Sequence, residues 1–368
     1  METPHLPVIT ITFQQLAETI IARSARGTMF LVVKDTTQTG EQVQEVKSAT
    51  FKSLKVNYTE GNQKYIEDVL NVNPFKLFVV KMGEETTIDQ VWELVKKTYS
   101  SGRIVLADGT AEEYKELADL VKLQEAFHAL TYNLEGTDCM YVENMKNQKV
   151  TFADERAEQE GIKFLPTLGA ILCVCNIKRA ATYYICDTLS YVEPAGTTED
   201  EINAEIAKGN IVLINDPYNG VNYVRIGEGI NTMTTTKDEF HTGDMKYIDI
   251  VEAMDAIRED IRQAFKSDFC GRKKNSTDNQ ALFVGDVNDY FHKLEMEEYG
   301  QILEPAYDNI AEIDVAAQRM AWSEEKSEAM DWDDTEVKNM PFHRTMFLTG
   351  DIKINGAMEN LRFKINMN

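Results

Sequence analysis

Residues 247–265 of the 368-residue chain read YIDIVEAMDAIREDIRQAF and decide the fold of its last third. After Ile248, apolar residues recur every three or four positions, a spacing that places them on one face of a helix of about five turns. These apolar residues are Val251, Met254, Ile257, Ile261 and Phe265. The sequence predicts that the charged residues between them face outward, namely Glu252, Asp255, Arg258, Glu259, Asp260 and Arg262. A loop rich in Gly, Lys, Asn and Ser (270–278) ends this helix, and a second helix follows.

Both ends of the chain carry runs in which apolar and polar residues alternate, the pattern of a half-buried strand. At the C-terminus these runs are 347–354 and 361–367, and the second is apolar at Leu361, Phe363, Ile365 and Met367. At the N-terminus the run Val8–Phe13 puts Ile9, Ile11 and Phe13 on one face. A terminal strand must pair with another strand or remain an exposed edge, so we expect both ends to find partners. A partner within the chain is also open to the last run, because Asn355-Gly356 can fold it back on 347–354 as a hairpin.

The middle of the chain alternates strands and helices, beginning with Met29–Val33, an apolar run typical of a strand buried on both faces. Further strands are predicted at 75–81, 103–107 and 149–152, a hairpin with strands at 211–214 and 221–226, and helices at 62–71, 87–99, 111–130, 161–177 and 199–207. Thr198 and Glu201 have the spacing of a capping box that starts the last of these helices. The alternation predicts a mostly parallel, layered sheet.

The predicted fold class is therefore α/β, or α+β when the whole chain is counted. It comprises a mixed layered sheet domain and a C-terminal α+β domain, with extended strand arms at both termini. We predict four parts: an N-terminal arm (1–25), the sheet domain (26–238, with its outer part at about 86–160), a C-terminal domain (239–345), and a C-terminal strand and arm (346–368).

Charge and cysteine content exclude several classes of protein. The chain holds 38 Lys and Arg against 61 Asp and Glu, a net charge of −23, which argues against direct nucleic-acid binding because that affinity comes mainly from neutralising phosphates. Five cysteines without framework spacing are expected to be reduced, so the protein is expected to be made in a cytosol. We see no N-terminal leader, and the longest apolar run, around 165–177, is shorter than the roughly 20 residues that span a bilayer. We therefore expect no membrane association.

A search for catalytic motifs finds none in the sequence. It has no G-x-S-x-G elbow and no phosphate-binding loop, and Gly227-Glu228-Gly229 is only half of a dinucleotide fingerprint followed by polar chain. His128 is placed in the predicted helix 111–130 without a visible Ser or Asp partner, and Cys173-x-Cys175 sits in an apolar run that favours buried thiols over a zinc site. We predict a protein that is not an enzyme, with no catalytic residues, no cofactor and no metal site.

A basic cluster follows the long helix, at Lys266, Arg272, Lys273 and Lys274. This local excess of positive charge, in a chain that is acidic as a whole, has two possible interpretations. One is a loop that only adds solubility, and the other is a contact with an acidic partner.

The order and spacing of residues over the last two hundred positions resemble those of the tail sheath proteins of contractile phage tails. The nearest pattern is that of the short sheaths of Gram-positive prophages and R-type bacteriocins. The residues that carry the resemblance are Lys246–Phe265, Asn275, Asp278-Asn279, Tyr290-Phe291, Ile313-Asp314, Ala317-Gln318, Phe347-Leu348, Ile352-Lys353-Ile354 and Ala357-Met358-Glu359, with Leu165-Pro166-Thr167, Ala180–Tyr183 and Arg225–Thr232 upstream.

The resemblance implies a structural subunit that forms stacked hexameric rings around a tail tube and contracts to drive the tube through a cell envelope. It implies that both termini add strands to neighbouring subunits: Val8, Ile9, Ile11 and Phe13, and Leu361, Phe363, Ile365 and Met367, pair near an acceptor strand that holds Phe347, Leu348, Ile352 and Ile354. It makes the C-terminal domain the innermost layer, so that the basic cluster meets the tube.

The partners implied are other copies of the chain, the tail tube protein, the baseplate and the tail terminator. The place implied is a virion tail or a bacteriocin particle, assembled in the bacterial host cytoplasm. In long members of the family the middle domain has a subtilisin-like topology, which here serves as a scaffold without its triad. The alternative is a cytosolic α/β hydrolase or ligand-binding protein, which would remain a single particle.

Overall fold

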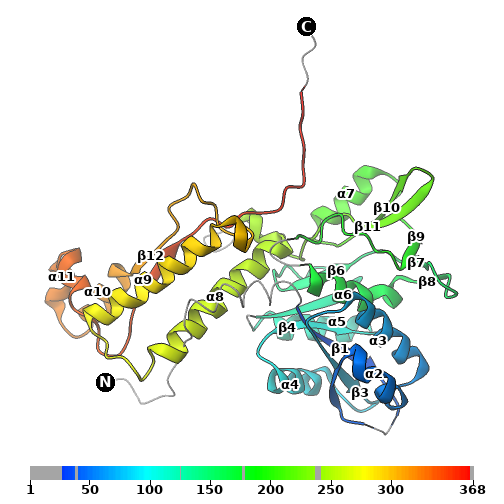
Figure 1. The fold of residues 1–368 in the computed structure, drawn as a ribbon, viewed down its shortest axis with the longest axis horizontal. Coiled ribbons are helices and arrows are strands. Elements are labelled where there is room, and N and C mark those ends of the chain that lie inside the picture. The colour runs from blue at the N-terminus through cyan, green and yellow to red at the C-terminus, as the bar shows by residue number, and fades with distance from the viewer. Residues whose placement is uncertain (1–26, 38–39, 125, 176–178, 237–241, 365–368) are drawn as a thin grey trace. The chain divides into compact units, whose positions relative to one another are not determined.

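The computed structural model describes residues 27–364 except 38–39, 125, 176–178 and 237–241 (Figure 1). The described residues divide into two compact units. We call residues 253–355 the C-terminal unit, and residues 27–252 together with 356–364 the sheet unit. The boundary falls inside the long helix α8 (Ile248–Asp268), which the sequence predicts from residue 248.

The described part of the sheet unit is built on one six-stranded sheet with the order β2-β3-β1-β4-β5-β6. All neighbours pair in parallel except the edge strand β2, which is antiparallel to β3. The predicted mostly parallel sheet is confirmed. The strands are β1 (Thr28–Lys34), β2 (Val43–Val46), β3 (Lys76–Met82), β4 (Gly102–Leu106), β5 (Phe127–Tyr132) and β6 (Val142–Met145).

The core of this unit is centred on β1, which lies between β3 and β4. Its residues Met29–Val33 are buried on both faces, and Phe30 stacks on Phe78 of β3 with ring centroids 5.2 Å apart. Each such buried apolar side chain contributes about 1.5–3 kcal/mol. The helix α3 packs against α6, and α4 packs against α5. These helices are α2 (Ser48–Leu54), α3 (Glu60–Val72), α4 (Ile88–Thr98), α5 (Ala111–Val121) and α6 (Leu165–Val174).

The predicted helix 111–130 is wrong in its second half. Helix α5 ends at Val121, and His128 lies in strand β5, not in a helix. The reason is that Phe127–Thr131 are buried on both faces of the strand, so they show no alternation, and such a run cannot be told from a buried helix by its pattern. The predicted helix 161–177 is likewise shorter, because Gly161–Phe164 form a 3-10 turn before α6.

Smaller elements complete the sheet unit. Strands β7 (Lys149–Phe152), β8 (Glu158–Glu160) and β9 (Leu189–Val192) form one sheet, and β10 (Leu213–Tyr218) and β11 (Val221–Ile226) form the predicted hairpin. Helix α7 (Glu199–Ala207) has the predicted bounds. The Thr198 side chain accepts a hydrogen bond from the Glu201 backbone, which confirms the capping box.

The C-terminal unit pairs two long helices with a small sheet. Helix α9 (Thr277–Leu294) follows α8, and β12 (Ile310–Ile313) pairs antiparallel with β13 (Leu348–Asp351). The short helices α10 (Val315–Ser323) and α11 (Asp334–Lys338) accompany a cluster around Trp322 and Phe342. Phe265, Phe269 and Phe283 fix the pairing of α8 with α9 through ring contacts 4.9–6.3 Å apart.

The predicted outer face of α8 is wrong at Asp260. This side chain is fully buried and accepts a hydrogen bond from the Tyr290 hydroxyl of α9 at 3.1 Å. A buried carboxylate is tolerated when a donor satisfies it, and α9 supplies that donor. Glu252 was also expected to face solvent, and it is instead bonded to a buried arginine of the sheet, described below.

Candidate assembly interface

Strand β13 lies within the predicted acceptor run 347–354 and pairs with β12 along one edge, with Leu348 opposite Ile313. Phe347 packs on Phe342, Ile354 bridges to Leu303, and Ile352 lies between them on the same run. Within the described part of the chain, no strand lies along the other edge of β13. That edge offers unpaired backbone groups to an added strand.

The outer edge of β12 is closed, in contrast to that of β13. The Asn288 side chain of α9 donates a hydrogen bond to the Ala311 carbonyl at 3.1 Å and accepts one from the Ala311 backbone N–H at 2.7 Å. An amide side chain placed in this way satisfies one residue of the strand as a neighbouring strand would. Within the residues that the structure describes, β13 is therefore the edge of this sheet along which a further strand could add.

The described part of the C-terminal segment forms no strand. Asn355 is still held by a backbone bond to Ile302, but residues 356–364 contain neither helix nor strand, so the hairpin alternative through Asn355-Gly356 is not formed there. Met358, Leu361 and Phe363 are 98%, 86% and 77% exposed. Exposed apolar side chains that lie close together on a surface are typical of a site that binds another protein.

The other predicted arm residues fall outside the described residues. Ile365 and Met367 follow the described part of the C-terminal segment, and Val8, Ile9, Ile11 and Phe13 precede residue 27. Their pairing remains a prediction.

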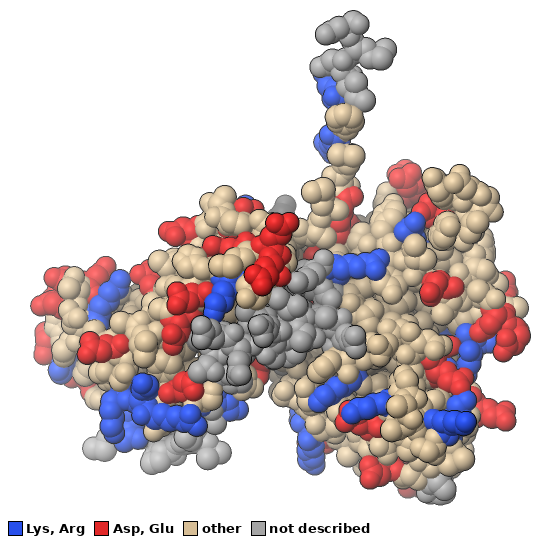
Figure 2. Space-filling model, viewed as in Figure 1, with Lys and Arg blue, Asp and Glu red and all other residues tan. Residues whose placement is uncertain are grey.

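The basic cluster is exposed and borne on an ordered loop. Lys266 lies in the last turn of α8, and Arg272–Lys274 lie in the turn that leads to α9 (Figure 2, where Lys and Arg gather over this loop). The Asn275 side chain donates to the backbone carbonyls of Phe342 and Thr345 at 3.1 Å, and Ser276 caps α9. These bonds anchor the end of the loop at the start of α9.

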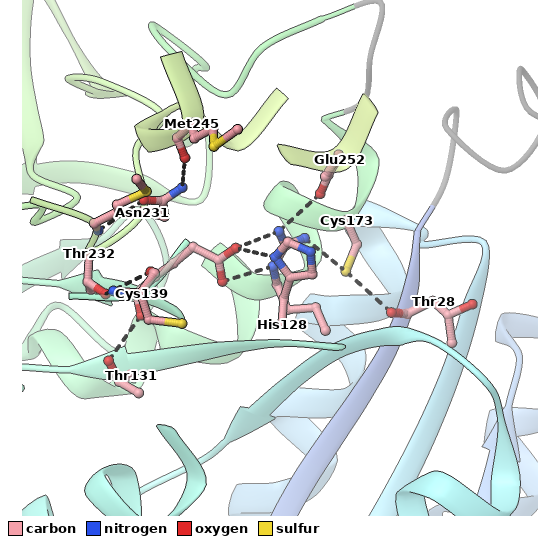
Figure 3. Close-up of polar contacts among 12 residues, drawn as sticks. Thr28, His128, Thr131, Cys139, Cys173, Asn231, Thr232, Met245 and Glu252 are labelled. Atoms are coloured by element: carbon pink, nitrogen blue, oxygen red, sulfur yellow. Dashed lines mark hydrogen bonds and ion pairs between the residues drawn. The ribbon is translucent and has the colours of Figure 1, made fainter. Parts of the chain in front are cut away.

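A buried ion cluster in the sheet unit was not predicted from the sequence. Arg103 of β4 donates to Glu143 of β6 at 2.9 and 3.3 Å and to Glu252 of α8 at 3.0 Å. His128 Nδ1 lies 3.0 Å from the same Glu143 carboxylate, and Figure 3 shows His128, Cys173 and Glu252 around this group. Arg103 is 3% and Glu143 0% exposed.

Burial and pairing oppose each other at this cluster, and pairing prevails. Burial alone would lower the pKa of Arg103, but Glu143 and Glu252 raise it well above its ordinary value. Burial alone would raise the pKa of Glu143, but Arg103 and His128 lower it to about 2. Both groups are therefore charged at neutral pH, and through Glu252 they join two strands of the sheet to α8 near its start.

This cluster has the chemistry of a structural ion pair. The nearest thiol, Cys173, is buried, and burial raises its pKa to about 11, so it stays a thiol rather than a nucleophilic thiolate. Among the described residues, no three His, Cys, Asp or Glu side chains are placed to hold a metal ion. None of the described helices combines the length and apolar character that a membrane crossing requires.

Comparison with known proteins finds similarity to tail sheath proteins. Residues 241–368 match the family model described as the phage tail sheath C-terminal domain. A curated tail sheath protein of Clostridium phage phiCD119 is 21% identical over 374 residues, and the match covers 98% of each chain.

Solved structures of sheath proteins share the fold. The sheath tail protein Lin1278 of Listeria innocua matches with a TM-score of 0.66 at 11% identity, over 83% of this chain and 93% of that chain. The helical sheath of the anti-feeding prophage in its contracted state matches with a TM-score of 0.67 at 12% identity, over 100% and 98% of the two chains. Residues 241–368 therefore match the phage tail sheath C-terminal domain, and the chain is similar along nearly its whole length to a phage tail sheath protein, in agreement with its sequence resemblance.

Proposed function

We propose that this protein is the structural subunit of a contractile tail sheath, a component of a virion tail or of a related particle. The observation that carries the proposal is the match to a phage tail sheath protein over 98% of both chains, with the sheath C-terminal domain at residues 241–368. The structure supports it with an open acceptor edge on β13 and an exposed apolar segment at residues 358–364. The solved relatives come from sheath and baseplate assemblies, which favours self-assembly and association with a baseplate.

The proposed assembly joins copies by strand addition. A segment such as 361–367 of one copy adds to the free edge of β13 of another copy, so that main-chain hydrogen bonds hold the joint and alternate side chains set its register. The N-terminal run 8–13 is proposed to act in the same way. On contraction the subunits rotate and slide while the added strands stay in place, and the extended sheath is a kinetically trapped state of higher free energy.

The tail tube protein is the proposed partner of the basic loop formed by Lys266, Arg272, Lys273 and Lys274. Exposed ion pairs contribute about 0–1 kcal/mol each and weaken with salt. Weak contacts repeated at every subunit suit a sheath that must release the tube when it contracts. The tail terminator is a further proposed partner at the end of the sheath.

The hydrolase or ligand-binding alternative is less well supported. Arg103 and Glu143, whose pKa values are both strongly shifted, are buried and paired with each other. We propose that the α/β sheet acts as a scaffold and carries out no catalysis. A protein of the alternative class would remain monomeric and bind a small molecule.

Electron microscopy of the purified full-length chain, alone and co-expressed with its tail tube protein, tests the proposal. We expect hollow, transversely striated cylinders. Dispersed single particles under both conditions would overturn the proposal and favour the monomeric alternative.

A further inference from the structure

We infer that the added C-terminal strand docks in one register, with Phe363 of one copy lying over Gly350 in β13 of its neighbour. This inference rests on the proposed sheath function and specifies which residues of the joint meet. The occupant of the β13 edge is thus a segment of a second copy of the chain.

The face of the small sheet that packs on α9 carries small residues at Gly350 and at its partner. Gly350 pairs with Ala311, so two small residues lie side by side, and Ala311 is buried while Gly350 is exposed. A Cβ at Gly350 would point toward Phe291 of α9 at 4.0 Å, with its nearest neighbour, the Ile310 carbonyl, at 3.4 Å. These are ordinary contact distances, so crowding within the subunit does not require a glycine here. A glycine on an edge strand leaves room that an aromatic side chain from the next strand can fill.

The C-terminal segment supplies a matching row of side chains. Leu361 and Phe363 are exposed and two positions apart, so they would share one face of an added strand, and Ile365 continues the same spacing in the sequence. With Phe363 opposite Gly350, an antiparallel strand places Leu361 opposite Ile352 and Ile365 opposite Leu348. A parallel strand exchanges these two pairings. Both acceptor residues are half-buried, so the added strand would complete their burial in either direction.

Charges on the other face agree with the same register. Asp351 is exposed, accepts a hydrogen bond from the Tyr307 hydroxyl at 2.8 Å, and lies diagonal to Glu312 on the neighbouring strand. With Phe363 at Gly350, the position opposite Asp351 is occupied by Arg362 or by Lys364, depending on the strand direction. Opposite charges that face each other across a strand pair are favourable and like charges are unfavourable, so this pair favours the same register.

Neighbouring registers lose one or both of these matches. A slip of one residue turns every apolar side chain to the outer face. A slip that puts Leu361 at Gly350 brings Glu359 onto the apolar row, opposite Ile352 or Leu348. A slip that puts Ile365 at Gly350 places Arg362 opposite Lys353 if the added strand is antiparallel. If it is parallel, Asp351 lies opposite the neutral Asn366. The register with Phe363 at Gly350 is the one that satisfies both faces.

Disulfide trapping in assembled tubes tests the register. The variant Gly350→Cys with Phe363→Cys, in a background with Cys139 and Cys270 changed to serine, should form intermolecular cross-links on oxidation, because opposed Cβ atoms come within disulfide reach. The matched variants Gly350→Cys with Leu361→Cys and Gly350→Cys with Ile365→Cys should cross-link at least tenfold more slowly. Faster cross-linking of either matched variant, or none of the first in intact tubes, would overturn the inferred register.

If the cysteine variants fail to assemble, a charge exchange between the two strands tests the same register. Arg362→Asp together with Lys364→Asp should abolish tubes, and adding Asp351→Arg should restore them. Tubes formed equally by all variants would overturn the register and leave the proposed function standing. Absence of tubes from the unmodified chain would instead overturn the proposed function.

Discussion

Arg103 and Glu143 are charged residues held in the interior of a β-sheet, where an unpaired charge would be very costly. Their two hydrogen bonds, together with His128 and Glu252, satisfy the charges and attach β4 and β6 to the start of α8. Burial of the pair is tolerated because both partners are present, so removal of one should cost far more than the net stability of the pair.

Replacing Arg103 by alanine should lower the free energy of unfolding by about 3–5 kcal/mol, because Glu143 then remains buried without its partner. Urea titration followed by circular dichroism measures this change. The control is Lys149→Ala on β7, which breaks the exposed pair with Glu158 on β8 and should change little. An equal decrease in the free energy of unfolding of the two variants would show that the buried ion pair stabilises the fold no more than the exposed pair does.

Asp35, directly after β1, gives a prediction about pH. Burial would raise its pKa, but hydrogen bonds from Asn62, Thr37 and Thr59 lower it to about 2 from an ordinary 3.8. A lowered pKa in the folded state means that the stabilisation is complete above the unfolded pKa and is lost as pH falls toward 2. The shift corresponds to about 2 kcal/mol.

Between pH 4 and pH 2, values that bracket the two pKa values, wild-type stability should therefore fall more steeply than that of Asp35→Asn. The free energy of unfolding at each pH provides the measurement. The exposed Glu112→Gln serves as the control and should follow the wild type. Parallel curves for wild type and Asp35→Asn would contradict the role given to Asp35.

Single residues are also where the sequence was least informative. Thr198 and Glu201 are three positions apart, so their capping box was visible in the sequence and is present in the structure. Arg103 is 40 residues from Glu143 and 149 from Glu252. Such pairs are formed by the fold, and no local pattern marks them. Asp260 was assigned to solvent for the same reason, since its donor Tyr290 lies 30 residues away.

At the scale of elements, local patterns in the sequence predicted the helices and strands that have one buried face and one exposed face. The amphipathic helix α8 and the alternating strand β13 were both found near their predicted positions. Strand β5 was not predicted because it is buried on both faces, so its sequence shows no alternation of apolar and polar residues. The partner of the run 361–367 was not given by its pattern either, because alternation shows that a strand has an apolar face and not which edge it joins.

Deleting residues 361–368 should prevent tube formation without unfolding the subunit. The segment's described part is exposed and has no strand partner among the described residues, so its loss removes nothing from a core. Circular dichroism should be unchanged while electron micrographs show no cylinders. Deleting residues 1–15 is predicted to have the same effect.

Either outcome at odds with this is informative. Normal cylinders from a truncated chain would refute strand donation by that arm. A collapsed circular dichroism spectrum would show that the arm folds into its own subunit.

At the scale of the whole molecule, each of the two units has its own buried residues, with Phe30 and Val79 central to one and Tyr290 and Trp322 buried in the other. Residues 361–364 are exposed and belong to neither described core, so we expect the subunit to fold without the added strands. The fold class followed from the alternation of strands and helices, whereas the assembly followed from the likeness to sheath proteins.

Reversing charge in the basic loop with Lys273→Glu and Lys274→Glu should weaken the proposed contact with the tube and leave sheath self-assembly intact. Co-sedimentation of tube protein with sheath should fall, and the wild-type value should itself decrease as salt rises. Lys115→Glu on the exposed face of α5 is the control. Unchanged co-sedimentation at every salt concentration would show that this loop does not contact the tube.

Hydrogen–deuterium exchange of the same chain, as tubes and as unassembled subunit, tests strand donation between sheath subunits most directly. The account predicts rapid exchange of the amides of 361–367 and of the β13 edge in the subunit, and strong protection of both segments in tubes, since a ladder of backbone hydrogen bonds forms there. Equally rapid exchange of 361–367 in both states would contradict it.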